Sequence, residues 1–407
     1  MIEKEEARKI IDETVAPTSR TEKTELAKSY GRVLAEDVVS DIDIPPFNRV
    51  TMDGYAVVSS DGPGEYEVAE DVPAGKFPEM ALKSGKVTKI MTGAPLPDGA
   101  DAVVQVEKTG GFADVGQMAQ INEGVGAGKN FCPKGEDIKK GDLALEPEIV
   151  IRPQEVAVLA SLGYDPVKVY KLPRIAIVAT GDELVEPAEK PEPGQIRNSN
   201  GYSTFSQVMA MGVEPVALGI ARDNYKSLRE KIEEGSKYDF LFISGGISAG
   251  DRDFVPEIVK DAGYELLFHK VKIKPGKPVM FGATKDNRYV FGVPGNPVSS
   301  MVIFELFIKP AIRKFARLPA YDGMMARATL KGEFTRKNDS RDEYLPVALK
   351  WNGSGFTASR VAYHGSGHFS AMTKANGLMY IPAGVKEIPA GGSIDVRFFD
   401  ETQVSMR

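Results

Sequence analysis

Residues 172–316 constrain the fold most strongly, because continuous apolar strands alternate there with segments of helical character. The predicted strands are RIAIVAT (174–180), EPVALGIA (214–221) and YDFLFISGG (238–246). Helices are expected from about 199 to 211 and over 223–235, the second opened by an Asp cap and closed by Gly235. Strands that are apolar on both faces and alternate with helices predict a parallel sheet inside an α/β layer. Ligands of such sheets bind beside the carboxyl ends of the strands.

The segments on either side of this region differ from it. From about 45 to 145, Gly and Pro separate short alternating runs, which predicts a β-rich domain. Helical spacing appears at 2–15, near 22–30 and at 151–164, where Pro153 falls in the first turn. We therefore expect four domains: an elongated helical linker domain (1–45 plus 140–170), an inserted β-rich domain (46–139), a central α/β domain (171–316) and a small C-terminal β-barrel-like domain (317–407).

The composition restricts the partners and the compartment. A formal net charge of -6 argues against a general nucleic-acid binder, so any anion site must be built from local Lys or Arg. Cys132 is the only cysteine, which excludes an intrachain disulfide and fits a reducing compartment. No signal-peptide core is visible, and no apolar run approaches the ~20 residues that span a bilayer. We expect a cytoplasmic protein that binds neither nucleic acid nor membranes.

Polar and glycine-rich motifs follow two of the predicted strands. ATGDEL (179–184) would place Asp182 and Glu183 at the mouth of the sheet, although a helix cap explains the same residues. SGGISAGDRDF (244–254) joins a glycine-rich turn suited to an anion with the carboxylates of Asp251 and Asp253. This second motif matches no standard phosphate loop. Its first half is suited to bind an anion, whereas its second half places two carboxylates beside that anion.

Lysines follow in KVKIKPGKPVMFG (270–282). Lys270, Lys272 and Lys274 alternate and would share one face of a strand. The Pro275-Gly276 turn would present the ammonium groups of Lys274 and Lys277 together, which predicts an anion site. A solvated lysine face is the alternative.

Three further Pro-framed turns are candidates for a polar site. GVPGNPVSS (292–300) puts Ser299 and Ser300 in the first turn of a helix, where free N–H groups favour an anion. PPFNRVTMDGYAV (45–57) has Asp53 in a turn, and IMTGAPLPDGADAVVQVE (90–107) has Thr92 ahead of another. The motifs that contain Asp53 and Thr92 could each be an ordinary β-hairpin turn without a binding role.

Taken in order along the chain, these motifs closely resemble molybdopterin molybdenumtransferases of the bacterial MoeA type, which are related to the C-terminal domain of gephyrin. The resemblance rests on PPFNRVTMDGYAV, IMTGAPLPDGADAVV, GEDI, ATGDEL, SGGISAGDRDF, IKPGKP, GVPGNPVSS and GSGHFSAMTKANGLMYIPAG, and it covers nearly the whole chain. It implies an enzyme that inserts molybdate or tungstate into adenylylated molybdopterin and releases AMP. The implied cofactor is a divalent cation, usually Mg²⁺.

The resemblance also implies roles for individual residues. The implied catalytic residues are Asp53, Thr92, Glu183, Asp223 and Asp253. The implied substrate contacts are Gly245, Gly246, Ser248, Lys270, Lys274, Lys277, Pro294, Asn296, Pro297 and Ser366, and the implied Mg²⁺ ligands are Asp137, Glu183, Asp251 and Asp253. A cation between acids and phosphates would explain why an anion loop carries carboxylates. Some relatives have more basic residues before GED, whereas FCPKGED offers only Lys134, preceded by Cys132 and Pro133.

An elongated homodimer is implied as well, with the α/β cleft of one chain facing the β-rich domain of its mate. Implied partners extend to the adenylyltransferase and the enzymes that accept the cofactor. Two alternatives stay open: adenylylation of molybdopterin by an α/β domain of this type, and a gephyrin-like scaffold that binds a partner helix. Substantial β domains on both sides of the α/β region argue against the first. The presence of every acidic and lysine site residue argues against the second.

Overall fold

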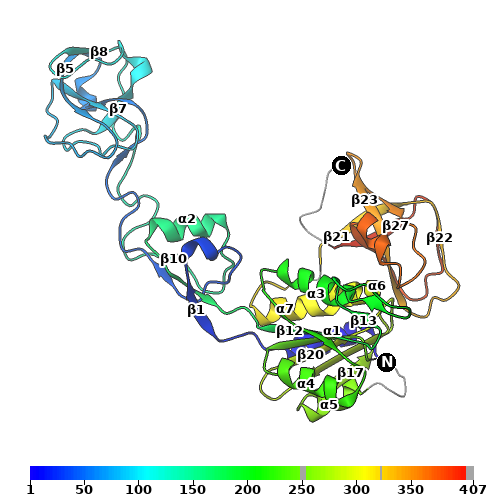
Figure 1. The fold of residues 1–407 in the computed structure, drawn as a ribbon. Helices are drawn as coiled ribbons and strands as arrows, with labels where there is room; N and C mark the ends of the chain where they lie inside the picture. The colour runs from blue at the N-terminus through cyan, green and yellow to red at the C-terminus, as the bar shows by residue number, and fades with distance from the viewer. Residues whose placement is uncertain (248–253, 321–322, 400–407) are drawn as a thin grey trace. The chain divides into compact units, whose positions relative to one another are not determined.

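The structure is a computed structural model and describes residues 1–247, 254–320 and 323–399 (Figure 1). It divides into two compact units: Met1–Glu22 with Tyr170–Arg407, and Lys23–Val169. Among the described residues, no helix has the length and apolar character needed to cross a membrane.

A six-stranded sheet forms the centre of the first unit, in the order β15-β12-β16-β20-β19-β17. The four strands β15 (Val216–Ala221), β12 (Ile175–Thr180), β16 (Phe240–Ser244) and β20 (Tyr289–Val293) run parallel. The fifth strand, β19 (Pro278–Ala283), pairs antiparallel with β20 on one side and with β17 (Glu265–Lys270) on the other. Every residue of β12, β16 and β20 is buried. The predicted parallel α/β sheet is therefore confirmed.

Helices cover both faces of this sheet, because alternate residues of each strand point to opposite sides. Ile177 of β12 packs in the core with α1 (Lys4–Thr14), α3 (Ser199–Met209), α6 (Pro297–Ile303) and α7 (Lys309–Phe315). Val178, the next residue, packs in the opposite core with α4 (Tyr225–Gly235) and α5 (Val255–Asp261). Figure 1 shows α4 and α5 together below the sheet. A π-helical segment, Phe304–Ile308, joins α6 to α7.

The C-terminal part of the first unit is a closed barrel. The strands β23 (Asp342–Trp351), β24 (Phe356–Arg360), β21 (Met325–Lys331), β27 (Ser393–Phe398) and β25 (Gly377–Ile381) pair in that order, and β25 pairs back to β23. The short strands β22 (Phe334–Thr335) and β26 (Glu387–Ile388) pair separately, and Phe369–Lys374 is a 3-10 helix. One strand of the α/β part, β18 (Ile273–Lys274), pairs parallel with β23. The predicted C-terminal barrel is confirmed.

The second unit contains a five-stranded sheet and a smaller helical part. The strands of the sheet lie in the order β7 (Ala102–Gln105), β4 (Gly54–Val57), β6 (Lys86–Ile90), β5 (Gly64–Val72) and β8 (Met118–Ile121). The short strands are β2 (Val38–Val39), β3 (Arg49–Val50), β9 (Phe131–Cys132) and β10 (Leu143–Leu145), and two 3-10 turns are Ser59–Asp61 and Val106–Lys108. The helix α2 (Pro153–Ser161) starts at Pro153 as predicted. It packs in a separate core with Leu34 and Ile151.

Two local predictions are wrong, and a third differs from the structure. The stretch 22–30 is not a helix but β1 (Thr21–Thr24) and a 3-10 turn (Leu26–Lys28), and no residue of that turn is buried to stabilise a helical face. The cap of α4 is Asn224, whose side chain accepts a hydrogen bond from Ser227 N, and not Asp223. The N-terminal helix α1 buries Ala7 and Ile11 in the α/β core, whereas the predicted division assigned 1–45 to the linker domain. The four-domain division stays a prediction.

Candidate active site

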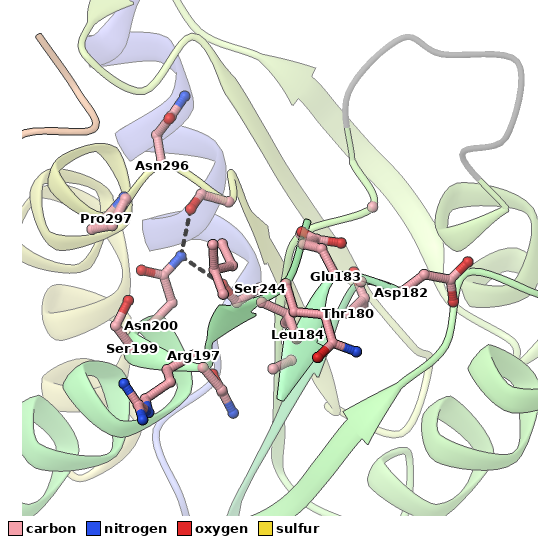
Figure 2. A pocket seen from close by; sticks show the side chains of 18 of the residues that line it. Thr180, Asp182, Glu183, Leu184, Arg197, Ser199, Asn200, Ser244, Asn296 and Pro297 are labelled. Atoms are coloured by element: carbon pink, nitrogen blue, oxygen red, sulfur yellow. Dashed lines mark hydrogen bonds between the residues drawn. The ribbon is translucent and has the colours of Figure 1, made fainter. Parts of the chain in front are cut away.

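A cleft of about 920 Å³ lies beside the carboxyl ends of β12 and β16 (Figure 2). Thr180, Asp182 and Glu183 line it after β12, and Ser244, Gly245 and Gly246 line it at the end of β16. The starts of α3 and α6 contribute Arg197, Asn198, Ser199, Asn200, Gly295, Asn296 and Pro297, and the C-terminal part contributes Gly367 and Phe369. The cleft is where the topology of a parallel sheet predicts a ligand.

The backbone at the end of β16 can be formed only by glycines. Gly245 has φ +99°, and a Cβ there would come within 2.6 Å of the Thr180 carbonyl oxygen. Gly246 has φ +62°, and its Cβ would lie 3.0 Å from Thr180 Oγ1. Thr180 is 4% exposed, and its Oγ1 has no hydrogen-bond partner in the described part of the chain. The two glycines therefore let the β16 loop lie directly on the end of β12.

Three acids stand on one side of the cleft, and backbone contacts hold them. Asp223 N donates to Asp182 Oδ1 at 3.0 Å, and Asp182 N donates to Asp223 Oδ2 at 3.4 Å. The Glu183 carboxylate lies over Gly181, where an added Cβ would meet Glu183 Oε2 at 2.5 Å. Arg222 Nη1 donates to the carbonyls of Asp182 and Leu184, so it supports the backbone of this turn. Because Asn224 caps α4, Asp223 is left to join this cluster.

The opposite side of the cleft is built around the start of α3. Asn198 caps this helix, since its side chain accepts a hydrogen bond from Gly201 N at 3.0 Å. Asn200 Nδ2 donates to Ser244 Oγ at 3.2 Å and to the Gly295 carbonyl at 2.8 Å, as the dashed lines in Figure 2 show. Asn200 thereby connects α3 to both loops of the cleft. The site predicted from the sequence did not include Thr180, Arg197, Asn200, Ser244 and Phe369. One local signal was present, because IRNSN places an Asn suited to cap a helix directly after Arg197.

None of the lysines predicted to bind phosphate is among the described residues that line the cleft. Lys274 Nζ instead lies 2.7 Å from Glu343 Oε1, and Glu343, 4% exposed, also pairs with Arg336 at 3.2 Å. Lys272 pairs with Glu3. The prediction that Lys270, Lys272 and Lys274 share one strand face is wrong, because β17 ends at Lys270 while β18 joins the barrel. Substrate binding by Lys270, Lys274 and Lys277 stays a prediction.

The turn before α6 enters the cleft only in part. Asn296 and Pro297 line it, whereas Pro294 is buried and does not, and substrate contact by these three residues stays a prediction. Ser299 and Ser300 lie in the first turn of α6 as predicted, but both are buried, and Ser300 N already donates to the Asn296 carbonyl. The Ser300 N–H is therefore not free for an anion, and anion binding at this helix start stays a prediction. The Ser366 carbonyl accepts from Val298 N at 3.1 Å, next to the cleft-lining Gly367.

In the second unit, two predicted residues that are 39 positions apart meet. Thr92 N donates to Asp53 Oδ1 at 2.7 Å. This backbone hydrogen bond, with a second from the Thr92 side chain, holds the pKa of the Asp53 carboxyl below its usual value. Asp137 is exposed, and its N donates to the Ile44 carbonyl at 3.0 Å.

The residues before GED in the second unit are engaged locally. Lys134 Nζ lies 3.3 Å from Asp43 Oδ2. The Cys132 thiol donates to Glu136 Oε2 at 2.7 Å, a hydrogen bond that raises the thiol pKa. Lys134 therefore already has an acidic partner within its own unit.

Ser248, Asp251 and Asp253 lie outside the described residues. Within the described ranges, no group of three or more His, Cys, Asp or Glu side chains is arranged to hold a metal ion. Mg²⁺ usually takes one or two carboxylates and completes its shell with water and substrate phosphates. The cleft offers the oxygen donors of Asp182, Glu183 and Asp223 at one edge, so its chemistry fits such an ion.

Three family models match the chain in succession. The first is the MoeA N-terminal region (domain I and II), over residues 2–163. The second is a probable molybdopterin binding domain, over residues 176–314. The third is the MoeA C-terminal region (domain IV), over residues 327–399. The residues that line the cleft fall within the second match, except Gly367 and Phe369, which fall within the third.

Curated relatives and solved structures agree with these models. The molybdopterin molybdenumtransferases of Staphylococcus epidermidis and Staphylococcus aureus are each 35% identical over 379 residues, with 91% of this chain and 89% of theirs covered. A crystal structure of a molybdopterin biosynthesis MoeA protein from Pyrococcus horikoshii is 32% identical, with a TM-score of 0.81 and 98% and 99% of the two chains covered. A second crystal structure of a MoeA protein from that organism has 30% sequence identity to this chain and a TM-score of 0.80.

The Thr180 hydroxyl, which has no hydrogen-bond partner among the described residues, gives a test of the packing below the cleft. Thr180→Val keeps the shape and removes the hydroxyl, so we expect the free energy of unfolding to rise by about 1 kcal/mol. Thr180→Ser keeps the hydroxyl and removes a buried methyl, so it should lower that free energy by about 1 kcal/mol. Urea titration monitored by circular dichroism measures both. A Thr180→Val protein that is less stable than the wild type would show that the Thr180 hydroxyl makes a stabilising hydrogen bond, and would contradict this prediction.

Proposed function

The chain belongs to the MoeA family of molybdopterin molybdenumtransferases, and we propose that it inserts molybdate into adenylylated molybdopterin with release of AMP. It is accordingly a transferase of molybdenum cofactor biosynthesis. The observation that carries the proposed reaction is the cleft at the strand ends of the matched molybdopterin-binding domain, which gathers Glu183, Asp223 and Gly245. Tungstate, a tetrahedral dianion like molybdate, is the other oxyanion that such a site could accept.

The cleft residues suit the cleavage of a phosphoanhydride. The backbone at Gly245 and Gly246 carries no side chain, so an oxyanion can approach it closely. One or two of the carboxylates of Asp182, Glu183 and Asp223, with water and substrate phosphates, would hold Mg²⁺, which would neutralise charge on those phosphates. An oxygen of molybdate or water would form a new P–O bond to the pterin phosphate while the anhydride P–O bond breaks, and the AMP phosphate would leave with that electron pair, so the site needs charge stabilisation more than a covalent protein nucleophile. Asn200 fixes the distance between the two loops that enclose the substrate.

Neither alternative function is favoured. An adenylyltransferase consisting of the α/β domain would leave the matches to the MoeA N-terminal and C-terminal regions unexplained. A scaffold would not need the carboxylates that line the cleft. The implied partners are the enzyme that supplies adenylylated molybdopterin and the enzymes that accept the finished cofactor. A cytoplasmic location is consistent with the single cysteine.

Release of AMP tests the proposed reaction. The protein is mixed with adenylylated molybdopterin, molybdate and Mg²⁺, and AMP is measured by chromatography. Glu183→Gln should lower the rate at least ~100-fold, because it removes a carboxylate that would hold the Mg²⁺ facing the substrate phosphates. Glu230→Gln is the matched control, since Glu230 is exposed on α4 outside the cleft, and its rate should equal that of the wild type. Wild-type protein that releases no AMP would refute the reaction.

We propose further that the active protein is a homodimer whose sites combine residues of both subunits. Asp53 and Thr92 meet in the second unit, whereas Glu183 and Asp223 line a cleft in the first. Both pairs have catalytic roles in the resemblance. A two-fold dimer can bring the second unit of each subunit to the cleft of the other, which creates two equivalent sites.

Mixed dimers test the shared site. Asp53→Ala and Glu183→Gln proteins should each be inactive alone. In a heterodimer, one site would carry both changes and the other neither, so random mixing should restore about a quarter of the wild-type AMP release and the isolated heterodimer about half. Differently tagged subunits, co-expressed and purified in tandem, isolate the heterodimer. Absence of recovery in that heterodimer, or full activity of a monomer by light scattering, would rule out the shared site.

A further inference from the structure

The charges that line the cleft are unequal. Asp182, Glu183 and Asp223 provide three carboxylates, and Arg197 is the only cation among the described lining residues. The substrate of the proposed function carries phosphates, which those carboxylates alone would repel. A phosphate in this cleft therefore needs a positive partner on the side away from the acids.

Arg197 stands on that side, on a fixed backbone. It is the last residue of β14 (Ile196–Arg197), which pairs parallel with β13 (Leu184–Val185), and the next residue is the buried helix cap Asn198. Figure 2 shows Arg197 on the α3 side with Ser199 and Asn200, and Glu183 and Asp182 on the other side. The acids and the cation thus enclose the cleft from opposite sides.

The guanidinium of Arg197 is held at one end only. Its Nε donates to the Glu189 carbonyl at 3.1 Å, the one partner recorded for this side chain in the described ranges. The planar guanidinium offers two further nitrogens, which suit bidentate contact with a phosphate. By contrast, Lys274 is paired with buried Glu343, and Arg222 donates to backbone carbonyls. Neither of these two lines the cleft.

A second observation marks the same cleft as a site for a polar ligand. Thr180 lines it, is 4% exposed, and keeps an Oγ1 without a hydrogen-bond partner among the described residues. Burying an unpaired hydroxyl costs free energy, which a polar ligand that reached this hydroxyl would offset. Polar groups of Ser199 and Asn200 line the cleft next to Arg197.

From these observations we propose that Arg197 is a substrate-binding residue that anchors a phosphate group in the cleft, opposite Glu183. The proposal rests on the proposed function, because adenylylated molybdopterin supplies the phosphate. That phosphate can come from the nucleotide side or from the pterin side of the anhydride. The chemistry of recognition, a guanidinium facing a phosphate oxyanion, is the same for both.

Equilibrium binding tests this role without turnover. The probes are AMP and molybdopterin, each titrated calorimetrically in EDTA so that Mg²⁺ does not contribute. Arg197→Gln should weaken binding of at least one probe by about 10- to 100-fold, the usual loss for a charge-assisted contact. Arg197→Lys should retain part of the affinity, because it keeps the charge and loses the planar fork. Arg229→Gln is the matched control, since Arg229 is exposed on α4 and paired with Glu233.

Each outcome decides the proposal. A loss confined to AMP places the phosphate on the nucleotide side, and a loss confined to molybdopterin places it on the pterin side. Equal affinities of wild type and Arg197→Gln for both probes, with an unchanged melting temperature, would overturn the role of Arg197. So would a wild type that binds neither probe. Failure of the proposed function appears separately, as wild-type protein that binds AMP but releases none from adenylylated molybdopterin.

Discussion

The close contact between the ends of β12 and β16 is the constraint on which the site depends. These strands pair in parallel with Ala179 opposite Ser244, so their following loops start side by side. Gly245 and Gly246 then lie against Thr180 with no room for a Cβ. This packing leaves an open backbone for the substrate. Asp182 and Glu183, which follow β12 after Gly181, line the cleft beside this contact.

Charge in the cleft is separated by the layout of the fold. The acids come from the loops after β12 and β15, where Asp182 and Asp223 exchange backbone hydrogen bonds. Arg197 comes from the strand before α3, across the cleft from them. A substrate whose phosphates lie between the two sides would meet a bound cation on one side and a guanidinium on the other. The glycine loop can thus accept an anion beside carboxylates.

Much of the fold could be predicted from the sequence, because apolar strands such as IAIVAT are buried on both faces and leave little freedom of assignment. The glycine loop and the acids were predictable for the same reason, since parallel strands end at one edge. The positions of the lysines could not be predicted in this way. Their alternation suggests one strand, but a change of sheet between Lys270 and Lys274 depends on pairing with β23, more than 60 residues later. Arg197 was missed because the helix-cap signal in IRNSN marks where α3 begins but does not show that the preceding arginine lines a cavity.

A crystal structure of the protein grown with AMP and Mg²⁺ would test the central claim most directly, namely that the cleft at the ends of β12 and β16 holds the phosphates of the substrate. The account predicts that the AMP phosphate lies inside this cleft, between the loop of Gly245 and Gly246 and the carboxylate of Glu183. AMP bound elsewhere, for example against Lys270 and Lys277 with the cleft filled only by water, would contradict it.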